Sequence, residues 1–258
     1  MSLFPVFVVG SPRSGTSILV QAMIKGGYFA YAEGNFLSLI RDLQRVVDQH
    51  FDTFGVSDEV LAGRVDRAML KIRLENVVAS MAGHLQMRTP WLDKTGNPEM
   101  IEIIPVLRRV WPNSRFILAR RRALENITSR LRKFPDYSFE YHCADWTRNM
   151  AAWRELRGRV PDLPCIEVDQ HDISAGPGGV AADIGHFLHM DEDHVSRLAR
   201  VLTRERPQQT EPGSADRVLC LDRMGWTDEQ RAIFHRICDS EMKSYGYSED
   251  ESYRVQVR

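Results

Sequence analysis

Val6-Phe-Val-Val-Gly10-Ser-Pro-Arg-Ser-Gly15-Thr-Ser17 joins a short apolar run to a loop bounded by two glycines. The run predicts a β-strand over residues 6–9, and residues 17–25 predict a helix that stops at Gly26-Gly27. A glycine-bounded loop between a strand and a helix can turn its backbone N–H groups inward, and the helix dipole adds positive charge there. The stretch therefore predicts a site for a phosphate-like anion.

One position of this loop departs from the GxxxxGK(S/T) pattern of P-loops, because Thr16 stands where the lysine belongs. In phosphoryl-transferring enzymes that lysine reaches the terminal phosphates and the next hydroxyl helps to hold magnesium. Here Arg13 supplies the cation, and the nearest candidate for a magnesium-binding aspartate is Val168-Asp169. A sulfuryl group carries less charge than a terminal phosphoryl group, so fixed cations and N–H donors suffice for it.

The composition predicts one domain, 1–258, in a chain of 258 residues with a net charge of −1. This charge gives no reason to expect nucleic acid or an anionic membrane as a partner. The four cysteines have no metal-binding spacing and are expected to be ordinary core residues in a reducing, cytoplasmic compartment. The apolar run 3–9 is shorter than a membrane span and lacks the features of a cleaved leader, so we expect an unprocessed chain.

Short β-rich runs alternate with longer helical stretches, which predicts parallel strands joined by crossover helices. The expected fold is a P-loop-type three-layer α/β/α arrangement around a parallel sheet of about five strands, at residues 6–9, 28–32, 91–94, 115–119 and 165–168. The expected later helices are 100–110, 124–133, 141–157, 180–189 and 228–245. Residues 36–90 predict a helical insertion beside the sheet that borders an acceptor pocket, and residues 203–217 predict a flexible polar loop.

The segment Gly10–Ser17 closely resembles the 5′-phosphosulfate loop of sulfotransferases that use 3′-phosphoadenylyl sulfate (PAPS). A second segment, Arg115–Lys133, runs from a strand through an arginine cluster into a helix, and it resembles the 3′-phosphate site of the same enzymes. In that family an arginine at the strand end and a serine eight residues later hold the 3′-phosphate, which matches Arg121 and Ser129. Taken alone, this stretch would be a solvated basic helix face.

The second segment departs from the commoner family pattern, because Arg122-Ala-Leu-Glu125 follows Arg121. Arg120 or Arg122 could therefore share the phosphate-binding role. Looser likenesses extend the resemblance over most of the chain. Trp91–Pro98 resembles a Lys-Thr-Pro region near the transferred group, which makes Lys94 a candidate cation, and a C-terminal segment makes Arg217 and Arg223 weak candidates for nucleotide binding.

The resemblance implies an enzyme that transfers a sulfuryl group from PAPS to an acceptor hydroxyl, or to an amine, by in-line displacement without a metal, leaving 3′-phosphoadenosine 5′-phosphate (PAP). The acceptor would be a small molecule or a glycan, in a pocket shaped by residues 35–90 and 134–160. The donor site would comprise Ser11, Pro12, Arg13, Ser14, Gly15, Thr16, Ser17, Arg121, Ser129, Arg217 and Arg223. The catalytic groups would be Arg13, Glu33 and Lys94.

The general base is predicted to be Glu33, which follows the expected second strand. Open α/β sheets bind ligands at the carboxyl ends of their strands, so Glu33 would face the same crevice as the loop. It could instead cap a turn. His84 and His142 are rival bases, although packed or surface histidines are commoner. The spacing of His186, His189 and His194 fits no metal site.

Two other functions remain open at this point. A P-loop kinase or nucleotide hydrolase would require magnesium and prefer ATP to PAP. A catalytically silent nucleotide-binding protein would keep the fold without turnover. The residues of the expected acceptor pocket do not distinguish a sugar from a phenol, lipid or peptide, and the oligomeric state is not encoded in any recognisable pattern.

Overall fold

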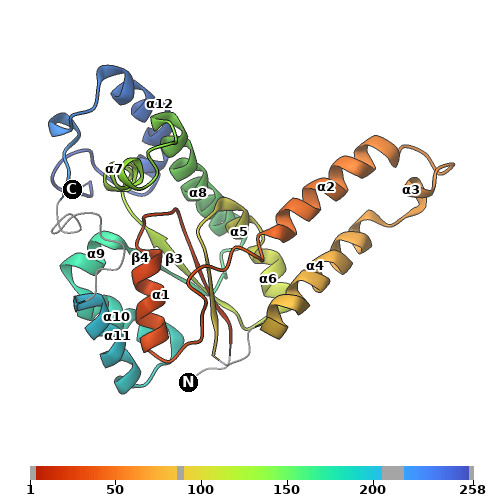
Figure 1. Cartoon of the computed structure of the whole chain (residues 1–258), viewed down its shortest axis with the longest axis horizontal. Coiled ribbons are helices and arrows are strands. Elements are labelled where there is room, and N and C mark those ends of the chain that lie inside the picture. Colours follow the sequence, from red (N-terminus) through yellow and green to blue (C-terminus); the bar gives the residue numbers. More distant parts are fainter. Residues whose placement is uncertain (1–3, 86–89, 205–217, 256–258) are drawn as a thin grey trace.

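The computed structural model describes residues 4–85, 90–204 and 218–255. Its described residues form a central sheet of four parallel strands in the order β2-β1-β3-β4 (Figure 1). The strands are β1 (Val6–Val9), β2 (Leu92–Thr95), β3 (Arg115–Arg120) and β4 (Cys165–Asp169). The predicted α/β architecture with a parallel sheet is confirmed, and the glycine-bounded loop follows the central strand β1.

The helices alternate with the strands along the chain. They are α1 (Thr16–Lys25), α2 (Leu39–Phe54), α3 (Leu61–Arg64), α4 (Arg67–Leu85), α5 (Pro98–Glu102), α6 (Ile104–Val110), α7 (Ala123–Lys133), α8 (Phe139–Arg159), α9 (Gln170–Ala175), α10 (Pro177–Leu188), α11 (Glu192–Arg204), the short 3₁₀ helix η1 (Leu221–Arg223) and α12 (Asp228–Ser244). In the described parts of the chain, no helix combines the length and apolar character needed to cross a bilayer.

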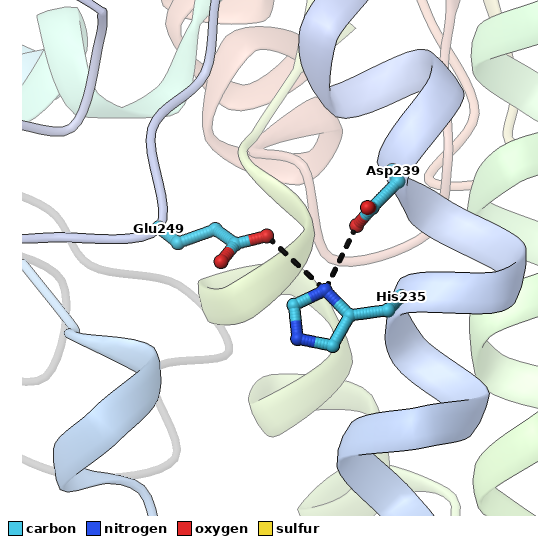
Figure 2. Close-up of side chains that lie close together, drawn as sticks. All are labelled: His235, Asp239 and Glu249. Carbon is cyan, nitrogen blue, oxygen red and sulfur yellow. Dashed lines mark hydrogen bonds and ion pairs between the residues drawn. The ribbon is translucent and has the colours of Figure 1, made fainter.

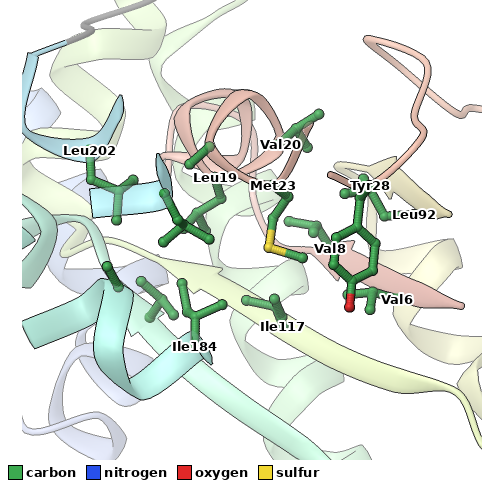
Figure 3. Packing of buried hydrophobic residues seen from close by; sticks show 14 of the residues in the cluster. Val6, Val8, Leu19, Val20, Met23, Tyr28, Leu92, Ile117, Ile184 and Leu202 are labelled. Carbon is green, nitrogen blue, oxygen red and sulfur yellow. The ribbon is translucent and has the colours of Figure 1, made fainter. Parts of the chain in front are cut away.

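Alternate residues of the strands fill two different cores. Val6, Val8 and Ile117 pack against α1, α10 and α11 on one face of the sheet (Figure 3). Phe7 and Phe116 pack on the other face, where α5, α6 and α8 close the second core. This alternation follows from the period of two along a strand, and the two covered faces explain why β1 is apolar at every position. A third cluster joins α7, α8 and α12.

The expected strand over residues 28–32 is reduced to a single parallel bridge between Phe29 and Trp91. Phe29 N–H donates to the Pro90 carbonyl at 2.9 Å, and Leu92 N–H donates to the Phe29 carbonyl at 2.9 Å. Beyond this point the chain leaves the sheet edge, and Gly34 N–H bonds the Lys94 carbonyl at 2.8 Å. The described sheet therefore has four strands instead of the expected five.

Two helix predictions also differ from the structure. The helix expected over residues 100–110 is two helices, α5 and α6, which meet at Ile103, and Pro105 in the first turn of α6 explains the break because it has no N–H. Helix α11 was not predicted, and it occupies the start of the segment expected to be a loop. The rest of that expected loop, 205–217, lies outside the described residues.

The predicted insertion is helical, and it forms a hairpin that projects from the body of the molecule (Figure 1). We call residues 39–85, which comprise α2, α3 and α4, the arm. Only the base of the arm joins the sheet: Ile40, Val78 and Ala82 are buried in the second core. The sequence predicts an insertion beside the sheet, whereas the arm projects away from the sheet (Figure 1).

Candidate functional site

The loop after β1 has backbone geometry suited to an anion. Gly10 has φ = 137° and Gly15 has φ = 91°, and Arg13 also lies at positive φ, 72°. A positive φ is uncommon outside glycine, so its presence at Arg13 points to a functional constraint. When residues of positive and negative φ follow one another, their backbone N–H groups point into a common concavity. The N-terminus of α1 follows directly at Thr16 and adds the positive end of its dipole.

Gly10 is required by its surroundings as well as by its φ. A Cβ at this position would lie 2.1 Å from the Ala119 carbonyl oxygen of β3. No side chain fits there, so the loop begins in direct contact with the neighbouring strand. This contact places the loop beside the end of β3, where the arginine cluster begins.

Helix α7 is attached to the loop by side-chain hydrogen bonds. Arg13 Nε donates to Ser129 Oγ at 2.9 Å. Asn126 Nδ2 donates to the Pro12 carbonyl at 3.0 Å and to Ser14 Oγ at 3.0 Å. The two segments that the sequence identifies separately thus form one site, although residues 13 and 129 are 116 positions apart.

Arg121 completes this site. Its Nη1 donates to the Arg13 carbonyl at 3.3 Å, and the residue is only 9% exposed. Burial lowers the pKa of Arg121. Its Nε is buried without a hydrogen-bond partner among the described residues. A buried cation with an unsatisfied donor beside an N–H-lined loop is suited to bind an anion.

The neighbours of Arg121 have other partners. Arg122 is fully buried and forms a two-pronged ion pair with Glu125, and it also donates to the Ser248 carbonyl at 3.0 Å and the Asp250 carbonyl at 2.7 Å. Arg120 faces Glu167 at 3.5 Å and Asp169 at 3.9 Å. These contacts engage both side chains within the protein, so Arg121 alone of the three is directed to the loop.

The predicted catalytic residues Glu33 and Lys94 form an ion pair. Lys94 Nζ also lies 3.5 Å from Ser17 Oγ, in the first turn of α1. Lys94 is buried, whereas the Glu33 side chain is half exposed. The structure therefore brings together a carboxylate that solvent can reach, a cation and the first turn of α1. The other predicted loop residues, Ser11, Pro12, Ser14, Gly15 and Thr16, lie in the loop and the first residue of α1.

A second carboxylate lies behind this pair. Asp93 is buried, and Thr95 Oγ1 donates to its Oδ1 at 2.9 Å and accepts from Asn35 N–H at 3.0 Å. Burial raises the pKa of Asp93 to about 6, the Thr95 hydrogen bond opposes the shift, and nearby Glu33 adds to it. Together these bonds fix residues 33–35 against the end of β2.

The rival histidines are engaged elsewhere. His142 is buried, its Nε2 contacts the Phe134 carbonyl at 3.2 Å, and Arg130 Nε donates to its Nδ1 at 3.3 Å. Burial, with Arg130 nearby, lowers the pKa of His142. His84 Nδ1 contacts the Ser80 carbonyl at 2.7 Å within α4. Both rings have structural partners, and neither is bonded to a described loop residue.

Asp169, the nearest candidate for a magnesium ligand, also has its oxygens occupied. It accepts from Tyr247 Oη at 2.7 Å, Tyr253 Oη at 2.6 Å and His171 N–H at 3.0 Å. It ends β4, which is separated from β1 by β3. Through these bonds Asp169 holds Tyr247 and Tyr253 of the C-terminal segment in place.

Two weak candidates from the sequence are not part of the described site. Arg223 is exposed and pairs with Glu251. Arg217 lies outside the described residues. Among the described residues, His235, Asp239 and Glu249 gather ligand atoms within 4.8 Å of one another (Figure 2). Both carboxylates point at one nitrogen, Nδ1 of His235, at 3.1 Å and 3.4 Å, which is the geometry of a surface ion pair.

Sequence reasoning missed two polar residues of α7, Asn126 and Arg130. Arg130 Nη1 donates to Ser11 Oγ at 3.1 Å and pairs with Asp145 at 2.7 Å. A signal was present, because Asn126, Ser129 and Arg130 follow the three- and four-residue spacing of one helical face. Once Ser129 is assigned to the loop, its neighbours on that face belong there as well.

Comparison with known proteins adds an independent line of evidence. The model of a family described as the sulfotransferase family matches residues 5–194. No curated protein matches the chain by sequence.

Solved structures of similar fold carry related descriptions. The chain is similar to the sulfotransferase domain of the olefin synthase from Synechococcus PCC 7002, with 18% identity, a TM-score of 0.57 and coverage of 95% of each chain. It is also similar to the sulfotransferase domain from the curacin biosynthetic pathway, with 16% identity, a TM-score of 0.52 and coverage of 93% of this chain and 98% of that one. A third similar structure is the sulfotransferase STF9 from Mycobacterium avium. It has 15% identity and a TM-score of 0.52, and the match covers 93% of this chain and 77% of that one.

Proposed function

The chain belongs to the sulfotransferase family, and we propose that it transfers the sulfuryl group of PAPS to a hydroxyl of a small-molecule or glycan acceptor. The observation that carries this proposal is the joining of two distant anion-binding segments. Arg13 bonds Ser129, and the buried Arg121 bonds the Arg13 carbonyl while its Nε has no described partner. One nucleotide with phosphate groups at both its 5′ and 3′ positions would engage both segments at once.

In the proposed division of roles, the loop N–H groups and Arg13 bind the 5′-phosphosulfate, and Arg121 and Ser129 bind the 3′-phosphate. The acceptor oxygen attacks sulfur, the bond from sulfur to the bridging oxygen breaks, and PAP leaves with that electron pair. Glu33 takes the acceptor proton, which suits its exposed carboxylate. Lys94, 3.5 Å from Ser17 Oγ, stabilises the charge that develops on the leaving phosphate.

A metal-independent reaction fits the residues present. The cations that face the loop are fixed side chains, and the bonds of Asp169 direct it to tyrosines and arginines instead of to the loop. The alternative of a magnesium-dependent kinase or hydrolase lacks an observation that favours it. The four cysteines are free thiols, which supports the proposal of a reducing, cytoplasmic location. Residues 36–90 are proposed to border the acceptor within a single domain spanning 1–258.

Calorimetric titration of the whole protein with PAP and with ATP, each in EDTA and in excess magnesium, tests the donor. We expect PAP to bind more tightly than ATP and equally well in both buffers. Tight binding of ATP that requires magnesium would refute the proposal in favour of the kinase.

Turnover is tested separately with ³⁵S-labelled PAPS and a panel of sugars, phenols and amines. We expect Arg13→Ala and Glu33→Gln to abolish transfer, with Glu33→Gln keeping PAP affinity because the residue serves the acceptor. Arg236→Ala, which removes an exposed arginine of α12 paired with Glu140, is the matched control. A protein that binds PAP yet transfers nothing to any acceptor would support a silent nucleotide-binding protein.

A further inference from the structure

Residues 30–38 connect the bridge at Phe29 to α2, and they include Glu33, the proposed general base. This segment forms neither helix nor strand, and residues 31–33 and 35 are exposed. A segment of this kind is mobile unless specific bonds hold it, because it buries little apolar surface. A general base must lie within hydrogen-bond reach of the proton that it takes. The bonds that hold residues 33–35 therefore bear on the proposed reaction.

Two backbone hydrogen bonds tie this segment to the end of β2. Gly34 N–H donates to the Lys94 carbonyl at 2.8 Å, and Asn35 N–H donates to Thr95 Oγ1 at 3.0 Å. In the part of the chain that the structure describes, these are the hydrogen bonds that the backbone N–H groups of residues 33–35 make. The second bond ends on a side chain, so a substitution at Thr95 can remove it while the backbone of β2 stays the same.

The hydroxyl of Thr95 is oriented by Asp93. A hydroxyl has one hydrogen, and Thr95 donates it to Asp93 Oδ1 at 2.9 Å, which leaves a lone pair to accept from Asn35. Thr95 is fully buried and Asp93 is nearly so, which shields the bond between them from water. The segment also packs closely on Asp93, because a Cβ on Gly34 would lie 2.0 Å from Asp93 Oδ2. We call the bonds among Asp93, Thr95 and Asn35 the clamp.

The backbone of Asn35 has an unusual conformation at the point where the clamp holds it. Its φ is 50°, in the left-handed region that residues other than glycine seldom adopt. Asparagine tolerates this region better than most residues, and it stays there where surrounding contacts determine the conformation. Backbone outliers gather at functional sites, so this conformation beside the proposed base points to a role for the clamp.

We propose that Thr95 is a positioning residue for Glu33: its hydroxyl, oriented by Asp93, fixes the backbone of residues 33–35 and so holds the carboxylate where it takes the acceptor proton. This inference rests on the proposed function, because it requires Glu33 to be the base. The ion pair with Lys94 is not sufficient, since a half-exposed carboxylate is held only weakly by its partner. Precision matters here, because a displacement of about 1 Å can lower a rate about 100-fold.

Kinetics of Thr95→Val test this role, because valine keeps the shape of threonine and removes the hydroxyl. The assay uses labelled PAPS and the fastest acceptor of the panel, at a pH well above the Asp93 pKa of about 6. We expect kcat to fall about 10- to 100-fold. PAP affinity should be unchanged, because the proposed donor site lies in the loop and in α7. Thr95→Ser keeps a hydroxyl and should restore most of the rate.

Thr147→Val is the matched control, because Thr147 Oγ1 of α8 donates to the Ile237 carbonyl of α12 at 3.1 Å. It makes the same chemical change away from the loop, so it should lower stability and leave kcat unchanged. Gly34→Ala is a second test in case Thr95→Val folds poorly. Its Cβ must displace either the segment or Asp93, so kcat should again fall while PAP affinity is kept.

Hydrogen exchange of the Asn35 amide measures the clamp without any turnover. In the wild type this N–H should exchange slowly although the residue is exposed, because it is bonded to a buried hydroxyl. Thr95→Val should speed its exchange at least about tenfold. Thr147→Val should leave it slow.

Four results would overturn the proposal. They are an unchanged kcat in Thr95→Val, a loss of kcat that Thr95→Ser does not restore, a loss of PAP affinity that matches the loss of kcat, and equally slow exchange at Asn35 in Thr95→Val and wild type. If the wild type binds PAP and transfers nothing, the proposed function fails and the catalytic role of Thr95 fails with it. Exchange at Asn35 then still shows whether the clamp holds the segment, so the two failures are distinguishable.

Discussion

Three consecutive arginines in this chain have three different tasks. Arg120 faces carboxylates of β4, Arg121 faces the loop, and Arg122 is buried with Glu125 and holds the C-terminal segment. The sequence identifies the cluster, and the resemblance selects Arg121. It leaves the roles of its neighbours open because the partners of Arg122 lie at 219, 248 and 250, far along the chain.

Because the two side chains have different partners, we expect Arg122→Ala to lower stability and Arg121→Ala to lower PAP affinity. Arg122→Ala leaves the Glu125 carboxylate buried without its cation and should cost about 3–5 kcal/mol of unfolding free energy. Arg121→Ala removes a buried cation that forms no described ion pair, so stability should change little while PAP affinity falls by about 1–3 kcal/mol. Urea unfolding and calorimetric titration of both variants separate the two effects. Unchanged PAP affinity in Arg121→Ala would remove that residue from the donor site.

Asp93 predicts a pH dependence of stability. Burial raises its pKa from 3.8 to about 6, so between these values the folded state binds a proton that the unfolded state does not. The contribution of Asp93 to stability therefore falls as the pH rises from 4 to above 6, by about 3 kcal/mol in total. Asp93→Asn should remove this slope, because the amide oxygen can still accept from Thr95. Urea unfolding at several pH values gives the check, and parallel curves for the two proteins would contradict it.

At the scale of elements, the loop is the part that the sequence predicts best. Its glycines, its position after an apolar run and its arginine are all local signals. The bridge at Phe29 and the break between α5 and α6 were harder to predict. The first depends on where the chain leaves the sheet edge, which local pattern does not specify. The second had a local signal in Pro105, which lacks an N–H and which lies inside the single helix expected over residues 100–110.

The two loop glycines should respond differently to substitution. Gly10→Ala would place a Cβ 2.1 Å from the backbone oxygen of Ala119, so either β3 or the loop must shift, at a cost of about 2–4 kcal/mol. Gly15→Ala is strained by its φ of 91°, but its nearest neighbour would be the Gln170 side chain at 3.3 Å. We expect about 1–2 kcal/mol there. Thermal unfolding of the two variants compares them, and an equal loss would show that strain in φ outweighs the contact.

At the scale of the whole molecule, the C-terminal segment closes the structure. Tyr247 and Tyr253 donate to Asp169 at the end of β4, and Arg122 at the end of β3 bonds the carbonyls of residues 248 and 250. Sequence pattern could not reveal this arrangement, because it pairs an aspartate and an arginine with residues more than 75 positions away. The fold class was predictable from local alternation, whereas this closure depends on the packed chain.

The closure predicts a specific loss of stability. Removing both hydroxyls, in Tyr247→Phe with Tyr253→Phe, leaves the buried Asp169 carboxylate short of two donors and should cost about 2–4 kcal/mol. Tyr28→Phe is the matched control, because the Tyr28 hydroxyl is buried with no hydrogen-bond partner among the described residues. Its removal should be neutral or stabilising. Urea unfolding of both proteins measures the difference, and equal losses would contradict the role assigned to Asp169.

The backbone bond from Gly34 to Lys94 has a consequence for how such a protein diversifies. It joins the two ends of the inserted segment directly, and the ion pair between Glu33 and Lys94, 61 positions apart, lies beside it. The geometry of the proposed catalytic pair, Glu33 and Lys94, is thus set at the base of the insertion and does not depend on what the insertion contains. A hairpin of another length or surface could therefore replace the present one, and we expect the ion pair between Glu33 and Lys94 to keep its geometry.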